Sequence, residues 1–95
     1  MTDKRKFTTE EAKWIGEQIG IDWNVYDLEQ FKMGLEVELE HGIVNPVTNV
    51  TNDDLTMTAK IALAHLCEIP DYYTRLKKME AEAESEMKAR LPADK

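Results

Sequence analysis

Residues 28–41 read LEQFKMGLEVELEH. Apolar side chains recur in this run at three- and four-residue steps, the period of one helical face: Leu28, Phe31, Leu35 and Leu39. Asp27, just before the run, is a typical N-cap, with Gln30 at the capping-box position, and Gly42 just after it is a typical helix stop. The stretch therefore predicts an amphipathic helix that buries one side.

A second helix is predicted before this one. Thr8 and Glu11 have the spacing of a capping box, in which each side chain bonds the other residue's backbone N–H, and Phe7 precedes them as an apolar staple. Apolar residues then recur at helical spacing as far as Ile19, and Gly20 is suited to end the helix. Residues 21–26 form a short connector.

Two more helices are predicted after a connector over residues 43–53. This connector is rich in Asn and Thr, and its four aliphatic side chains predict that part of it packs down. The third helix runs over about 55–69, capped by Asp53 or Asp54, with this apolar stripe: Thr58, Ile61, Ala62, His65, Leu66 and Ile69. The fourth begins near Asp71, ends before Pro92, and has this predicted packed side: Tyr72, Leu76, Met79 and Ala83.

These elements predict an all-α fold. The 95 residues suit one small domain over 1–95, a bundle of about four helices with a long loop between the second and third. Residues 1–6 are predicted to be a disordered tail, and residues 81–95 a solvated helix end and tail with little to bury.

The charge is acidic and unevenly placed. Of the net −7, residues 10–41 supply nine acids and two lysines, which sum to −7 by themselves. Such a surface repels nucleic acid and anionic membranes, and it suits cations or a basic protein partner. We therefore expect no nucleic-acid and no membrane partner. A protein partner would contact the 10–41 surface or the helix over 77–91.

The cysteine content indicates a reducing compartment. A secreted domain of this size usually carries several cysteines, whereas this chain has one, Cys67, which we expect to be a small buried side chain. The basic N-terminal residues are followed by no apolar stretch, so no secretory signal is expected. We therefore expect a cytoplasmic protein, of a prokaryotic cell or of a phage-infected one.

Two Glu/His pairs form the candidate site. Glu38 and His41 lie three residues apart, as do His65 and Glu68, so each pair presents a carboxylate and an imidazole on one helix face. Glu-x-x-His motifs on facing helices hold metals in four-helix carboxylate proteins, and this ligand set suits one divalent Zn, Fe, Mn or Ni ion. The alternative is structural: a Glu38–His65 or Glu68–His41 hydrogen bond would satisfy these semi-inward groups equally well.

Other chemistry is weakly represented. Tyr72, Tyr73 and Arg75 suit the lining of a pocket, although a core role is usual for the aromatic rings. The chain has no Gly-rich phosphate loop and no nucleophile–base set, which argues against an enzyme.

Four stretches of this sequence resemble a family of small helical proteins of unknown function from bacteria, archaea and their phages. They are FTxEEA at 7–12, LEQFxMGLEVELEHG at 28–42, TNVTNDD at 48–54 and KIALAHLxEIPDYYxRL at 60–76. The resemblance implies a stand-alone helical domain and assigns no activity. Its motifs include all four Glu and His residues of the candidate site.

Two functional hypotheses follow. In the first, Glu38, His41, His65 and Glu68 bind a metal ion. In the second, the chain is an acidic protein–protein interaction or regulatory module of a phage or its host, without chemistry, and the Glu/His pairs only fix the packing.

Overall fold

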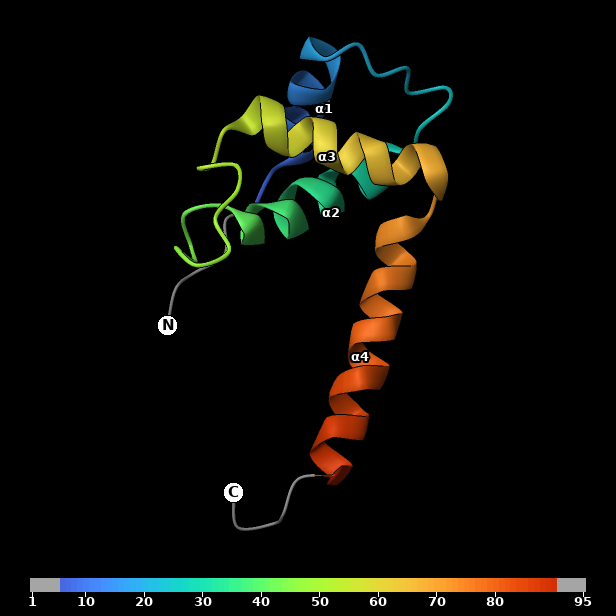
Figure 1. The fold of residues 1–95 in the computed structure, drawn as a ribbon. Coiled ribbons are helices and arrows are strands. Elements are labelled where there is room, and N and C mark those ends of the chain that lie inside the picture. The colour runs from blue at the N-terminus through green and yellow to red at the C-terminus, as the bar shows by residue number, and fades with distance from the viewer. Residues whose placement is uncertain (1–5, 91–95) are drawn as a thin grey trace.

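The computed structural model describes residues 6–90, with side chains described as far as Lys88. Over that range the backbone is helical and contains no strand, which confirms the predicted all-α class (Figure 1). The elements are α1 Thr9–Gln18, α2 Leu28–Glu38, the 3-10 turn η1 Leu39–His41, α3 Leu55–Glu68 and α4 Tyr72–Arg90. The predicted helix stop at Pro92 and almost all of the predicted 1–6 tail lie outside the described residues.

The predicted N-caps are confirmed. Thr8 accepts from the backbone N–H of Glu11 at 3.1 Å, and the Glu11 carboxylate accepts in return from the N–H of Thr8 at 2.9 Å. Asp27 caps α2 and Asp54 caps α3 by accepting from the backbone N–H groups of Gln30 and Met57, the third residue of each helix. Gly20 adopts φ +83°, a left-handed conformation that glycine reaches without strain, and α1 has ended before it.

The end of α2 differs from the prediction of one helix up to His41. The regular helix stops at Glu38 and tightens into η1 over Leu39–His41. A 3-10 turn is a common way to satisfy the last carbonyls of a helix, and here the N–H of Gly42 bonds to the carbonyl of Leu39.

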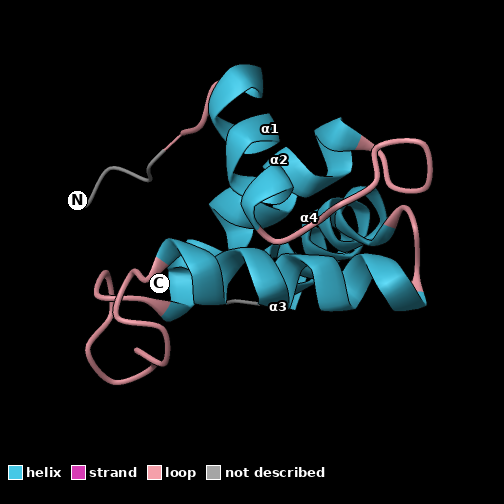
Figure 2. Ribbon diagram, turned by 90° about the horizontal axis from the view of Figure 1, so that it is seen from above, coloured by secondary structure: helices cyan, strands magenta, loops and turns pink. Residues whose placement is uncertain are grey.

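Helix α2 is the centre of the packing and contacts each of the other α-helices. Figure 2 shows α1, α2 and α3 packed together, with α4 seen nearly end-on. Phe31 and Leu35 of the predicted α2 stripe are fully buried, as are Ala59 and Ala62 of α3. Leu28 and Leu39, at the two ends of the stripe, are only half-buried.

The connector between η1 and α3 packs down less than predicted. Its aliphatic side chains are exposed, Val47 by 90%, whereas Thr51 is buried. The loop is held by its backbone: the N–H of Val50 bonds to the carbonyl of His41, and the N–H of Ile43 bonds to the Asp53 carboxylate. Polar turn contacts, and not apolar burial, therefore set its path.

Helix α4 departs from the predicted bundle. Its start packs on the body as far as Leu76, and the rest projects away from the other helices (Figure 1). The predicted packed side is correct only as far as Leu76, because Met79 and Ala83 are exposed. The fully buried side chain of α4 is instead Tyr73.

Two further properties bear on function. Cys67 is exposed, contrary to the prediction, because it lies on α3 beside Leu66 and not on the buried stripe. Its thiol is 3.2 Å from the Tyr26 hydroxyl.

Among the described residues, no helix combines the length and the apolar character needed to cross a membrane.

Candidate functional site

Glu38, at the end of α2, lies at the centre of the predicted site. Its side chain is buried, with 4% of the residue exposed, and its Oε2 accepts a hydrogen bond from the Tyr73 hydroxyl at 2.8 Å. The Nε2 atom of His65 lies 3.5 Å from the same oxygen, and the Nε2 of His41 lies 4.0 Å from Oε1. Side chains from η1, α3 and the start of α4 therefore converge on one carboxylate of α2.

The contact with Tyr73 explains how Glu38 can be buried. A carboxylate removed from water is unfavourable unless hydrogen-bond donors replace the water, and the phenol supplies one. Burial raises the pKa of Tyr73 well above its usual value, and the hydrogen bond to Glu38 raises it further. Tyr73 is therefore a neutral hydrogen-bond donor at physiological pH.

The His65 ring joins Glu38 to the first turn of α4. It stacks on Tyr72 with ring centroids 4.3 Å apart and an interplanar angle of 8°. It also meets the Tyr73 ring edge to face at 6.0 Å. Both arrangements are favourable for aromatic pairs, so His65 of α3 helps to fix the orientation of α4.

A second polar contact, which the sequence reading missed, comes from Gln30. The prediction placed its side chain in a capping box with Asp27, but its Oε1 accepts from the backbone N–H of Tyr73 at 3.1 Å. Its Nε2 donates to the Thr74 hydroxyl at 2.5 Å. We call this set the α4 clamp: Gln30, Glu38, His65, Tyr72, Tyr73 and Thr74.

Gly34 makes room for the clamp. A Cβ atom added there would come within 2.5 Å of Cε2 of Tyr73 and within 2.9 Å of the Cβ of Ala62. The phenol ring therefore packs directly on the backbone of α2, between Gln30 and Glu38. Glycine at position 34 is therefore required for this approach, because even the methyl group of alanine would meet the ring.

The predicted metal ligands are only partly brought together. Glu38, His41 and His65 gather, but Glu68 is exposed, and no Glu68–His41 contact is present among the described residues. His41 was expected to face partly inward, yet its side chain is 56% exposed, because the chain tightens into η1 and His41 is the last residue of that turn. Within residues 6–90, no set of three or more His, Cys, Asp or Glu side chains has the geometry to hold a metal ion. The contacts favour the structural alternative.

Of the three residues suggested for a pocket, Tyr72 and Tyr73 belong to the clamp. The third, Arg75, is exposed and pairs with Asp71 one turn earlier, with its Nε 2.7 Å from Oδ1. An exposed pair of this kind contributes little to stability.

The remainder of α4 forms a second candidate feature. Every side chain from Lys77 to Lys88 is exposed, and we call this segment the α4 arm. Met79 is 53% exposed and Met87 61% exposed. Together with Leu76 and Ala83 they recur at three- and four-residue steps, as in a helix that packs against another helix.

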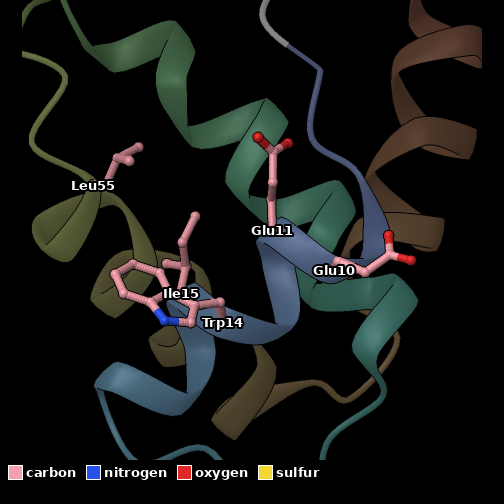
Figure 3. A pocket seen from close by; sticks show the side chains of 5 residues that line it. All are labelled: Glu10, Glu11, Trp14, Ile15 and Leu55. Atoms are coloured by element: carbon pink, nitrogen blue, oxygen red, sulfur yellow. The ribbon is translucent and has the colours of Figure 1, made fainter.

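A shallow pocket of about 380 Å³ lies between α1 and the start of α3. Figure 3 shows Trp14 and Ile15 of α1 on one side, Leu55 of α3 across from them, and the carboxylates of Glu10 and Glu11 extending away from the indole. Trp14 is 63% exposed. The polar residues that line the pocket are exposed, so none is a buried group aimed at a ligand.

The comparisons with known proteins give a family and no activity. A family model described as "Protein of unknown function (DUF5661)" matches residues 12–82. This range includes the whole clamp and the first half of the arm. No match was found among curated proteins or among solved structures.

Proposed function

The chain belongs to the DUF5661 family, whose function is unknown, and from its own geometry we propose that it is a cytoplasmic protein–protein interaction module that acts through the α4 arm. The observation that carries the proposal is the exposure of every side chain from Lys77 to Lys88, two large methionines included. An isolated helix of about 12 residues is marginal in water, and most helices are stabilised by packing. A partner that packs on the arm would supply that stabilisation.

The clamp supports the same proposal. It attaches the first turn of α4 to α2 at two points, Gln30 and Glu38, and to α3 through His65. Because the attachment is buried and directional, the arm leaves the body at a fixed angle. An arm held in this way loses less conformational freedom on binding than a free tail does.

The cytoplasmic setting is proposed from the single cysteine. Cys67 is exposed, and a reducing compartment keeps an exposed thiol from forming disulfides between molecules.

Photo-crosslinking in the cells that naturally produce the protein tests this function. A photoreactive amino acid replaces Met79 in one variant and Lys78, which lies about 100° round the helix from it, in a second. We expect the Met79 variant to form one discrete cross-linked species, identifiable by mass spectrometry, and the Lys78 variant to form much less of it. Cross-links of equal yield from both positions, or none from either, would contradict an arm with a specific binding face.

A further inference from the structure

We infer that the partner of the α4 arm is a basic amphipathic helix that lies along the stripe of Leu76, Met79, Ala83 and Met87. This inference rests on the proposed function and specifies its partner. It is carried by the distribution of charge around the arm, which is separate from the exposure that suggests binding.

The stripe has the form of a helix-docking face. Its four residues follow at steps of three, four and four, so they lie on one side of α4. From Leu76 to Met87 they span about 16 Å at 1.5 Å per residue. Helices that dock on one another are anchored by side chains at such steps. Leu76 is half-buried against the body, so the stripe begins at the clamp and runs outward along the arm.

The edges of the stripe are acidic. Successive helical residues turn by about 100°, which places Glu80 and Glu84 along one edge and Glu82 and Glu86 along the other. Lys77 and Lys88 follow just beyond Glu84 on one side, and Lys78 follows beyond Glu82 on the other, so the glutamates are the charged residues nearest the stripe. The apolar face is therefore bordered by four carboxylates, although the arm as a whole is close to neutral.

This border selects the partner. A helix with lysine or arginine beside its apolar side chains would place positive charge against both edges. It would also offset the repulsion between Glu80 and Glu84, which are like charges one turn apart on the free arm. An acidic helix would bring like charges together and is disfavoured.

A second copy of this chain is disfavoured for the same reason. Residues 80–86 contain four glutamates and no lysine or arginine. Two arms packed stripe to stripe, parallel or antiparallel, would oppose these acidic edges. The net charge of −7 adds a general repulsion between copies.

The test uses full-length protein and three labelled synthetic peptides in a fluorescence anisotropy titration at low salt. The first peptide is an 18-residue helix of leucine and lysine with leucines on one face. The second has the same composition with the leucines scattered, and the third carries glutamate in place of lysine. We expect saturable binding of the first peptide, at least tenfold tighter than binding of the other two.

Three double variants locate the site. Met79→Gln with Met87→Gln removes the stripe, and Glu80→Gln with Glu84→Gln removes one acidic edge, while both retain good helix formers. Glu10→Gln with Glu17→Gln removes the same charge from α1 as the matched control. We expect the two arm variants to bind at least tenfold more weakly, and the control to bind like the wild type.

The outcomes separate the partner class from the function. Tighter binding of the glutamate peptide, lost in the Met79/Met87 variant, would keep the arm as a docking surface and overturn the basic partner. The first two peptides could also bind equally well, with the α1 control weakening binding as much as the arm variants do. That result would mean nonspecific attraction to an acidic protein, and it would overturn the inference. Absence of binding at 100 µM by the first peptide would overturn it as well.

Discussion

The Tyr73 hydroxyl donates a 2.8 Å hydrogen bond to the Glu38 carboxylate, which lies 35 residues earlier in the chain. Both groups are buried, and their hydrogen bond replaces one that each would make with water in the unfolded chain. This one bond joins the end of α2 to the first turn of α4, and it accounts for a buried acid that the sequence alone presented as a metal ligand.

A double-mutant cycle on this pair measures its contribution. Tyr73→Phe leaves the buried carboxylate without its donor, and Glu38→Met leaves the buried phenol without its acceptor. We expect each single change to lower the free energy of unfolding by about 1–3 kcal/mol, and the double variant to lose clearly less than the sum. Tyr72→Phe, which keeps the stacked ring, is the matched control and should change stability by less than about 0.5 kcal/mol. The unfolding free energies are measured by urea denaturation. If the loss in the double variant equalled the sum of the two single losses, the two groups would not interact.

The raised pKa of Tyr73 predicts a loss of stability in alkali. The folded pKa lies above that of the unfolded chain, which is about 10. Below pH 10 both states hold the proton and this residue adds no pH dependence. Above pH 10 the unfolded chain releases the proton first, so stability falls by about 1.4 kcal/mol per pH unit.

Urea denaturation between pH 8 and 11.5 measures this slope. Tyr73→Phe should flatten it, while Tyr26→Phe should leave the Tyr73 contribution in place. An ultraviolet titration in which every tyrosine of the folded protein ionises near pH 10 would show that Tyr73 is not buried as described.

Shortening the chain tests whether the arm is structural. The side chains of residues 77–88 are exposed, so a chain that ends at Lys78 should keep its unfolding free energy within about 0.5 kcal/mol. A chain that ends at Pro70 also loses Tyr73 and the clamp, and it should be strongly destabilised. Thermal denaturation followed by circular dichroism compares the two. If the chain that ends at Lys78 no longer unfolded cooperatively, the arm would have a role in folding.

Metal addition tests the structural interpretation of the Glu/His pairs. Since the described ligands do not form a metal-binding set, chelator and added Zn, Fe, Mn or Ni should leave the melting temperature unchanged. An ion bound at 100 times its Kd would stabilise the protein by about 2.7 kcal/mol, which is easily detected. One ion could instead raise the melting temperature of the wild type and of Glu68→Ala but not that of His65→Ala. That result would support a metal site whose ligands include His65 and exclude Glu68.

Most of the fold could be predicted from the sequence because its signals are local. The Thr8 box, the Asp27 cap and the Phe31–Leu35 stripe each depend on residues within one or two turns. The extent of packing along α4 could not be predicted this way. Its stripe continues unbroken past Leu76, and only the positions of the other helices show where its neighbours end.

The site was predicted in part for a similar reason. Semi-inward positions correctly indicated Glu38 and His65, whose 3.5 Å approach then depends on how α2 and α3 cross. The role of Gln30 could not be seen, because its spacing from Asp27 suggested a local contact while its partners lie more than 40 residues away. The nearest available signal for Tyr73 was Gly34, a glycine inside a helix that marks a close approach by another group.

A backbone NMR titration of the full-length protein with the leucine–lysine helix shows directly whether the α4 arm is the interaction surface. We expect the largest amide shift changes from Leu76 to Met87, with little change around Trp14 and along the rest of α1. Changes centred on the Trp14 pocket, or spread evenly over the acidic residues of 10–41, would place binding on the body of the protein and contradict a binding role for the arm.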